Sequence, residues 1–566
     1  MTVAEAIFTA IKIRKIDYVF CVPGESFLAT MDSFYGSLKP LLVSARHEEG
    51  AGIMAEAYAK ASAKTGVCMV TRGPGLTHLS IALHTAKQDS TPLVVFVGQV
   101  PTHVRHREAF QELDVVEFTR PVAKWAVELI RVDRVAEIVD KAFHIANSGR
   151  PGPVVISLPE DIDRSSGAEH SVWRGSTVGT PSPSVLGVEK AVSIIEEAER
   201  PCIVAGEGVL HANATDKLVH FAECLEAPVF TAWRRFDAFP NKHPLYMGGL
   251  HPSSIANDLS EPLKNADLII AIGTRLDEFT TLNYSSPSME QKLIHIDQSP
   301  EDTGGSWIGA DLALVADTGE AMDKLEEALK NSKRAKPSNS RQKQIAEWSE
   351  YFSKWTTPRS DRMGLKDGTI DLEGVYHDIV NILDDDASTT CDAGDFGGWL
   401  IRYYKWNKPR TFFGPTTGAM GYALPAAIAA KLARPQAPAI AFAGDGGFAM
   451  TMSELETAVR LKLDGLVVLV FNNNNFGTIR RHQNREFPSR PVVTGLGTID
   501  FAAIAKAMGA EGFKVSRNVE FAKAFKAALN AGCPAVIDIT VGGNSLDPWA
   551  EKKETPFHLL VDYLKL

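Results

Sequence analysis

The sequence predicts an α/β protein made of three doubly wound parallel-sheet units, and three observations lead to this expectation. Short strands built almost entirely from Val, Ile and Leu recur along the whole chain, as in "PLVVFVG" (92–98) and "LVVLVF" (466–471). Segments with helical spacing separate these strands, and this alternation is typical of parallel sheets that helices cover on both faces. The 566 residues also suffice for about three or four domains of roughly 150 residues each.

Two polar stretches divide the chain into these units. Residues 164–186, "RSSGAEHSVWRGSTVGTPSPSVL", are rich in Ser, Gly, Pro and Thr, and residues 331–345, "NSKRAKPSNSRQKQI", are polar and basic. Both compositions are typical of linkers. We therefore predict domains at residues 1–165, 186–330 and 365–550.

The expected strands follow one another through all three units. They are 18–22, 66–71 and 92–98 in the first unit, 202–206, 267–273 and 292–297 in the second, and 439–444 and 466–471 in the third.

Composition excludes several classes of function. The net charge is -10 and no long basic run is present, which argues against a nucleic-acid partner. The 6 Cys form no C-x-x-C pair, so we expect buried free thiols rather than a metal knuckle or a disulfide framework. The start "MTVAEAIFTAIKIRK" lacks the features of a secretory signal, and no apolar run is long enough for a membrane span. We expect a cytoplasmic protein with no membrane partner.

Polar residues gather at the ends of two strands in the third unit. The strand at 439–444 runs into "GDGG" (444–447), and the strand at 466–471 runs into Asn472 and Asn473. The helix between them carries its apolar face at Leu455, Ala458, Val459 and Leu463. Ligand sites of parallel sheets lie at the carboxyl ends of strands, where these groups meet.

The residue types at these two strand ends suit a diphosphate bound through a metal ion. A glycine-rich turn that opens a helix offers N–H groups to phosphate. Asp445 and Asn473 offer the hard oxygen ligands that Mg²⁺ takes together with substrate phosphates. Either turn alone is an ordinary strand-end turn, and it is their combination that predicts the site.

The spacing of these groups resembles the thiamin-diphosphate motif, in which GDG is followed by about 25 residues and NN. The resemblance implies thiamin diphosphate and Mg²⁺ as cofactors. It implies that the metal ligands are Asp445, Asn473 and the backbone carbonyl of Asn475, and that Gly444, Gly446 and Gly447 lie at the diphosphate.

The stretch "SARHEEGAGIMAEAYAKASAKTGVCMVTRGPGLTH" (44–78) resembles the pyrimidine-binding domain of the acetolactate synthase group. The three units are then a pyrimidine-binding, a central and a diphosphate-binding domain. The resemblance places Glu48 at the family's catalytic glutamate, whose carboxyl hydrogen-bonds the pyrimidine N1′ of the cofactor. Glu49 and Glu56 are the competing carboxylates, and a Glu at a helix start is otherwise a cap or a solvated group.

Further segments resemble the same group. "CVPGES" resembles a turn beside the cofactor and brings in Pro23 and Gly24. "REAFQELDVVEFTRPVAKW" resembles a stretch that lines the substrate pocket and brings in Phe110 and Gln111.

Two C-terminal segments extend the resemblance. "GPTTGAMGYALPAAIAA" brings in Gly418 and Met420, and Met420 falls on the apolar residue that bends the cofactor, with plain core packing as its alternative role. "GDFGGW" brings in Gly394 beside the diphosphate, and "LDPWAEKKETP" (546–556) resembles the group's ending.

The sequence also departs from the group's pattern. Arg72 replaces a Ser, His482 replaces a Trp, and Arg480 and Arg481 lie beside it. These residues are candidates either for binding an anionic substrate or for surface salt bridges. In the central unit, "GTRLDEF" (273–279) keeps only part of the group's flavin stretch, so FAD stays open as a further cofactor.

The resemblance implies a thiamin-diphosphate carboligase that decarboxylates a 2-keto acid such as pyruvate and transfers the acyl unit to a second carbonyl. Small keto acids or aldehydes are then the substrates, and a homodimer or homotetramer with sites at subunit interfaces is the working unit. Alternatives are a 2-hydroxyacyl-CoA lyase, a sulfoacetaldehyde acetyltransferase, a simple 2-keto acid decarboxylase, an FAD-dependent pyruvate oxidase-like enzyme and a non-catalytic thiamin-fold binding protein.

Overall fold

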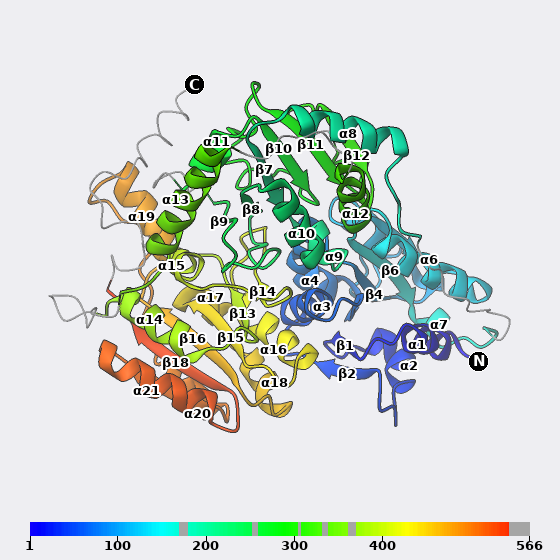
Figure 1. Cartoon of the computed structure of the whole chain (residues 1–566). Coiled ribbons are helices and arrows are strands. Elements are labelled where there is room, and N and C mark those ends of the chain that lie inside the picture. Colours follow the sequence, from blue (N-terminus) through cyan, green and yellow to red (C-terminus); the bar gives the residue numbers. More distant parts are fainter. Residues whose placement is uncertain (169–178, 252–258, 304–306, 331–337, 360–369, 543–566) are drawn as a thin grey trace.

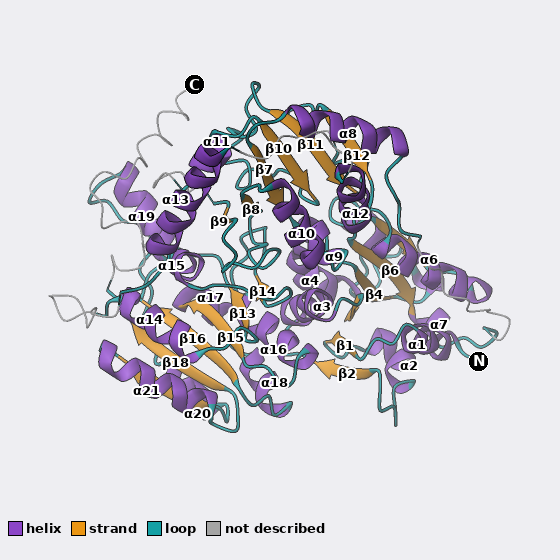
Figure 2. Ribbon diagram, viewed as in Figure 1, coloured by secondary structure: helices purple, strands orange, loops and turns teal. Residues whose placement is uncertain are grey.

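Three parallel six-stranded sheets, each flanked by helices, make up the chain in a computed structural model (Figures 1 and 2). The structure describes residues 1–168, 179–251, 259–303, 307–330, 338–359 and 370–542. In Figure 1 the C-terminal sheet lies at the lower left, the N-terminal sheet at the lower right and the central sheet at the top. The predicted fold class is confirmed. The predicted "LDPWAEKKETP" ending lies outside the described residues.

The N-terminal sheet has the strand order β2-β1-β3-β4-β6-β5. Its strands are β1 (Tyr18–Cys21), β2 (Leu41–Ser44), β3 (Gly66–Thr71), β4 (Leu93–Gln99), β5 (Trp125–Glu128) and β6 (Pro153–Pro159). Its helices are α1 (Val3–Ile13), α2 (Leu28–Asp32), α3 (Glu48–Ser62), α4 (Arg72–Gln88), α5 (Val115–Thr119), α6 (Val135–Asn147) and α7 (Glu160–Asp163).

The central sheet has the order β12-β11-β10-β7-β8-β9. Its strands are β7 (Pro201–Ala205), β8 (Val229–Thr231), β9 (Tyr246–Gly249), β10 (Leu268–Ile272), β11 (Lys292–Asp297) and β12 (Leu312–Val315). Its helices are α8 (Val185–Glu197), α9 (Glu207–His211), α10 (Thr215–Leu225), α11 (Glu261–Lys264) and α12 (Thr318–Leu329).

The C-terminal sheet has the order β14-β13-β15-β16-β18-β17. Its strands are β13 (Ser388–Cys391), β14 (Phe412–Phe413), β15 (Ala439–Gly444), β16 (Leu466–Asn472), β17 (Glu511–Val515) and β18 (Ala535–Thr540). Its helices are α14 (Leu372–Ile382), α15 (Phe396–Tyr403), α16 (Ala423–Ala433), α17 (Asp445–Thr451), α18 (Glu454–Arg460), α19 (Gly477–Glu486), α20 (Phe501–Ala507) and α21 (Asn518–Leu529).

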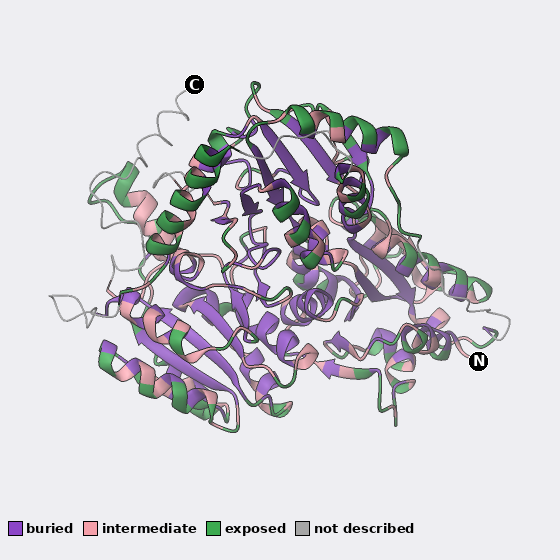
Figure 3. Cartoon of the chain, viewed as in Figure 1, coloured by how far each residue is buried: buried purple, intermediate pink, exposed green. Residues whose placement is uncertain are grey.

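The inner strands of the three sheets are almost completely buried, edge strands such as β2, β5 and β12 are partly exposed, and the peripheral helices have exposed outer faces (Figure 3). This agrees with the near-continuous apolar strands of the sequence, because both faces of each sheet are covered.

The second predicted linker is helical over its last part. Helix α13 (Asn339–Trp355) begins there, and the Ser338 hydroxyl caps it by accepting from the Arg341 N–H. Ile345 and Phe352 of α13 pack on the central domain, so an apolar face within this polar stretch was missed. The domain boundaries themselves stay predictions.

Helix α3 joins the N-terminal and C-terminal domains, because it packs against α16 in one shared apolar core. Residues 50–61 of α3 are all buried, and most of them are Ala or Gly. Such small side chains let two helices approach closely, and a helix that is apolar all round is a buried one. The predicted glutamate of this helix therefore stands on a rigid element.

None of the helices in the described part of the chain is both long enough and apolar enough to cross a membrane.

Candidate active site

A cavity of about 240 Å³ opens at the carboxyl ends of β13, β15 and β16. Nine residues predicted for the cofactor and the metal line it: Gly394, Gly418, Met420, Gly444, Asp445, Gly446, Gly447, Asn473 and Asn475. They meet because β15 and β16 are neighbours in the sheet, with Gly444 paired to Phe471. Gly444 and Asn473, 29 positions apart in sequence, thus line the same cavity.

Asp445 begins α17 and is 6% exposed. Its Oδ1 accepts the Gly446 N–H at 2.8 Å, whereas its buried Oδ2 has no protein partner. Burial raises the pKa of Asp445, and backbone N–H groups of the asparagine turn oppose that shift. A buried carboxylate oxygen without a donor is costly unless a ligand satisfies it, so this atom fits a bound cation.

The asparagine turn is built by its own amides. The N–H of Asn475 donates to Oδ1 of Asn473 at 3.0 Å, and the side chain of Asn475 donates to the Asn473 carbonyl at 2.7 Å. Asn472 instead donates to Asp538 on β18 at 3.0 Å, which ties the turn to the sheet. Asn474 takes the left-handed conformation, with φ of 54°, which Asn tolerates better than most residues. Asn473 therefore lines the cavity, whereas Asn472 has a structural role.

Asp392, at the end of β13, is a residue that the sequence reasoning missed. Its Oδ1 accepts from the Ala423 N–H at 2.6 Å and its Oδ2 from the Gly421 N–H at 3.2 Å. Burial raises the pKa of Asp392 to about 7. A Cβ on Gly447 would lie 2.3 Å from the same carboxylate, so only glycine fits there. Asp392 fixes the segment that directly follows Met420.

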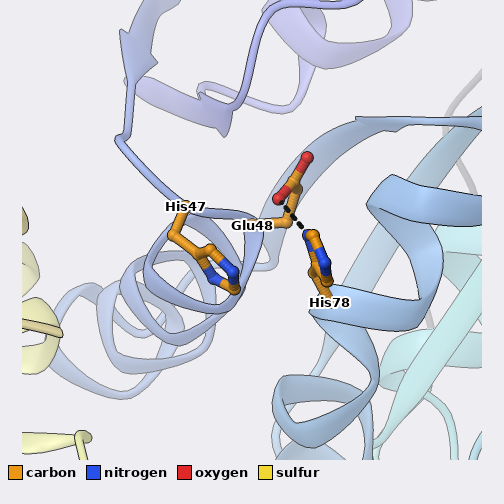
Figure 4. Close-up of side chains that lie close together, drawn as sticks. All are labelled: His47, Glu48 and His78. Atoms are coloured by element: carbon orange, nitrogen blue, oxygen red, sulfur yellow. Dashed lines mark hydrogen bonds and ion pairs between the residues drawn. The ribbon is translucent and has the colours of Figure 1, made fainter. Parts of the chain in front are cut away.

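Glu48 lies at the first position of α3 and makes a hydrogen bond with His78 of α4 (Figure 4). Oε2 of Glu48 and Nδ1 of His78 are 2.9 Å apart. The Glu48 side chain is 12% exposed and the His78 side chain 52%. The His47 ring stacks on the His78 ring, with centroids 4.6 Å apart.

Glu454, on α18, holds the segment that leads into Glu48. Its Oε1 accepts the N–H groups of Arg46 and His47, each at 3.0 Å. Burial raises the pKa of Glu454, against the effect of its hydrogen-bond donors. No signal in the sequence linked this residue to a segment about 400 positions earlier.

Glu56 and Glu49, the carboxylates that compete with Glu48 for the catalytic role, lie in different surroundings. Glu56 is completely buried, where it accepts from Thr91 and Tyr422 at 2.7 Å each and pairs with Lys60 at 2.6 Å. Glu49 faces α16, with Oε1 3.5 Å from where a Cβ of Gly421 would lie. Burial raises the pKa of Glu49.

The other predicted N-terminal residues do not line the cavity around Asp445. Pro23 is exposed, Phe110 is 74% exposed, and Gln111 is half-buried. The Gln111 carbonyl accepts the Gly73 N–H at 3.0 Å. Gly24 lies against Thr71, which would be 2.5 Å from an added Cβ. Within a single chain, these residues therefore lie outside the lining of the cavity around Asp445.

Most of the residues that depart from the family pattern pair with acidic or amide side chains. Arg72 is buried and donates to Glu25 at 2.9 Å and Glu160 at 3.0 Å, so the structure has the salt-bridged alternative. Arg481 forms an ion pair with Asp395 at 2.8 Å.

Arg480 and His482, which also depart from the family pattern, lie on α19. Arg480 donates to Asn475 at 2.6 Å, and His482 contacts Arg485 at 2.8 Å. Burial, with the nearby Arg485 and Arg481, lowers the pKa of His482.

The central domain has a second cavity at the ends of β7, β10 and β11, where Gly208, Arg275 and Asp297 contribute to its walls. Its volume is about 50 Å³, far below the roughly 300–1,000 Å³ of small-molecule pockets. Arg235 lines it and is ion-paired with Asp89 and Glu207.

The chain matches three family models along its length. They are the N-terminal TPP binding domain, the central domain and the C-terminal TPP binding domain of thiamine pyrophosphate enzymes, at residues 1–118, 188–325 and 392–539.

Curated relatives match nearly the whole chain. It is 32% identical to a "Probable acetolactate synthase large subunit" of Methanococcus aeolicus, over 96% of this chain and 93% of the relative. It is 30% identical to an acetolactate synthase large subunit of Buchnera aphidicola, over 97% of this chain and 99% of the relative. It is 33% identical to that of Corynebacterium glutamicum, over 96% of this chain and 87% of the relative.

Proposed function

This chain belongs to the thiamine pyrophosphate enzyme family as an acetolactate synthase-like carboligase, and from that premise we propose how its residues divide the work. The reaction is the decarboxylation of a 2-keto acid such as pyruvate, followed by transfer of the acyl unit to a second carbonyl. When bound, thiamin diphosphate supplies the carbanion that adds to a carbonyl carbon. The protein positions and tunes that chemistry.

The observation that carries the proposal is the buried Oδ2 of Asp445 without a protein partner, beside the Asn473 amide in the cavity. Asp445, Asn473 and the Asn475 carbonyl would hold Mg²⁺, since Mg²⁺ prefers oxygen ligands and keeps substrate phosphates in its shell. Gly446 and Gly447 would lie beside the diphosphate. Met420 would support the bend of the cofactor, because it lines the same cavity.

Glu48 would hold a proton against the pyrimidine nitrogen of the cofactor. Its carboxylate contacts the partly exposed His78 ring. Glu56, by contrast, is fully engaged in the core. Gln111 would contact the donor keto acid.

The working unit would be a homodimer or a homotetramer. In one chain Glu48, Phe110 and Gln111 do not line the cavity around Asp445, so a complete site needs the N-terminal face of a second copy. The 74% exposure of Phe110 suits a surface that a partner covers. We place this assembly in the cytoplasm.

The alternatives have less support. The curated relatives named above carry synthase rather than oxidase names, which favours a carboligase over a flavin-dependent oxidase. The intact Asp445, Asn473 and Glu48 argue against a non-catalytic binding protein. The curated relatives carry synthase names rather than lyase or decarboxylase names.

Proton NMR of the full chain with pyruvate and Mg²⁺, with and without thiamin diphosphate, tests the proposal. Cofactor-dependent formation of acetolactate or acetoin is expected. Acetaldehyde as the sole product would indicate a decarboxylase. If the protein binds the cofactor and consumes no pyruvate, the pyruvate proposal is wrong, and sulfoacetaldehyde and 2-hydroxyacyl-CoA are the next donors to test.

A further inference from the structure

His78 is placed to take part in the protonation of Glu48. Its Nδ1 lies 2.9 Å from Glu48 Oε2, and the two side chains point toward each other, Glu48 from the start of α3 and His78 from the second turn of α4 (Figure 4). The His47 ring stacked on His78 has its own Nδ1 engaged, because it accepts the Glu49 N–H at 3.2 Å. Of the two imidazoles, His78 is therefore the one that contacts the carboxylate.

Other titratable groups lie around the pair, and a ring nitrogen of His47 is itself within 4.8 Å of the Glu48 carboxylate and of His78. Glu49 of α3 lies near Gly421, and Glu454 of α18 accepts backbone N–H groups. Cys68, on β3, lies beneath the pair, and burial raises the pKa of its thiol well above the ordinary value. Arg72, at the start of α4, is paired with two other carboxylates. Among these groups, His78 is the one whose ring nitrogen is recorded at hydrogen-bond distance from the Glu48 carboxylate.

We propose that His78 and Glu48 share one proton, and that His78 is a positioning residue that supplies it to Glu48. The proton lies on His78 Nδ1 while the carboxylate is free, and it passes to Oε2 when Glu48 meets the pyrimidine nitrogen. The Nδ1–H bond breaks and leaves its electron pair on nitrogen, while a carboxylate lone pair forms the new O–H bond. Rotation about Cγ–Cδ of Glu48 then turns this O–H toward the cofactor.

A single shared proton follows from the surroundings of the pair. The His78 side chain is 52% exposed in one chain, so water reaches the ring there. When a second copy covers this face, loss of water disfavours a charged imidazole. The proton then stays on the carboxyl. This inference depends on the cofactor role proposed above for Glu48.

Isothermal titration calorimetry of the full chain with thiamin diphosphate and Mg²⁺ tests the shared proton. Measured in two buffers of different ionisation enthalpy, the heats give the number of protons taken up on binding. At about pH 6, where a free imidazole is mostly protonated, wild type should take up about zero protons. His78→Asn keeps a hydrogen-bond donor but holds no exchangeable charge, so it should take up about one.

His84→Asn is the matched control, since His84 is an exposed residue on the same helix, and it should behave as wild type. The affinity of His78→Asn should fall about tenfold per pH unit from about pH 5.5 to 7, whereas that of wild type stays nearly flat up to the imidazole range. Equal proton uptake in wild type and His78→Asn would overturn the proposal.

If His78→Asn does not bind the cofactor, NMR of the apoprotein decides. Glu48→Gln should shift the pH at which the His78 ring signals titrate, and an unchanged titration would overturn the shared proton. Failure of wild type to bind the cofactor at all would instead sink the proposed function. The two failures are therefore distinguishable.

Discussion

Two carboxylates with opposite surroundings define the candidate site at the scale of single residues. Asp445 is buried beside a turn of backbone N–H groups and has an unsatisfied oxygen. Glu48 is the first residue of α3, and its carboxylate contacts the exposed imidazole of His78. The first environment suits a fixed metal ligand, and the second suits a group that gains and loses a proton.

Glu48→Gln should lower turnover by about 10²–10⁴-fold, the usual range for a positioned acid–base group. Cofactor affinity, measured by quenching of intrinsic fluorescence, should change little because the amide keeps the shape of the carboxyl. Glu49→Gln, one residue along the same helix, should cost much less. Near-wild-type turnover of Glu48→Gln would remove the assignment.

Asp445→Asn should weaken Mg²⁺-dependent cofactor binding by more than about tenfold, because a ligand should matter at least as much as the groups around it. The measurement is cofactor retention after dialysis at several Mg²⁺ concentrations. Asp464→Asn, at an exposed Asp in the same domain, should retain cofactor like wild type. Equal retention by both variants would contradict the metal role.

At the scale of elements, the position of Glu48 depends on α3 being held from both sides. Small residues along α3 allow close contact with α16. At the start of the helix, the carboxylate of Glu454 fixes the backbone that leads into Glu48. The two domains thus set the direction of the predicted catalytic residue together.

Glu454→Ala should destabilise the protein by about 1–3 kcal/mol, the cost of leaving part-buried N–H groups without an acceptor. It should also reduce turnover, because the Glu48 segment loosens. Glu456→Ala, on the same helix, removes partly exposed pairs with Arg46 and Arg460 and should cost no more than about 1 kcal/mol. Denaturant unfolding and steady-state rates check both, and equal costs would refute the role of Glu454.

At the scale of the whole molecule, a buried ionic network connects the three domains. Lys60 of α3 pairs with Glu56 and with Asp89, and Asp89 pairs with Arg235 of the central domain at 3.1 Å. The Thr416 N–H of the C-terminal domain donates to Asp89 at 2.9 Å. Asp89 therefore contacts groups from every domain.

Asp89→Ala should destabilise the protein by about 3 kcal/mol, the lower end of the cost of breaking a buried pair, because Lys60 and Arg235 each lose one of their two carboxylate partners. Burial opposes ionisation of Asp89, but Lys60 and Arg235 outweigh it and hold the pKa of Asp89 below its ordinary value. The depressed pKa means that this stability is present above about pH 4, the ordinary value for Asp, and is lost as the pH falls toward the folded-state value.

The difference in unfolding free energy between wild type and Asp89→Ala should accordingly shrink in acid. Denaturant unfolding across about pH 3 to 7 measures it. Asp216→Ala, at an exposed position, serves as the control. A difference that is constant across this range would contradict the network.

The eight strands named from the sequence were predictable because each one is a local apolar run, whereas edge strands such as β2 and β5 were not named. The stretches at 66–71 and 292–297 coincide with β3 and β11. The helix between β15 and β16 was expected to be continuous, yet it divides into α17 and α18. The roles of Asp392 and Glu454 were missed because their partners lie about 30 and 400 positions away in sequence.

The sequence by itself determined the three parallel sheets and the meeting of Asp445 with Asn473, because both groups end strands that the chain connects through one short crossover. Only the tertiary structure decided which way each side chain turns. It paired Arg72 with two carboxylates, committed Glu56 to the core and brought His78 to Glu48. These outcomes depend on contacts between distant segments, which local patterns of polarity and spacing do not encode.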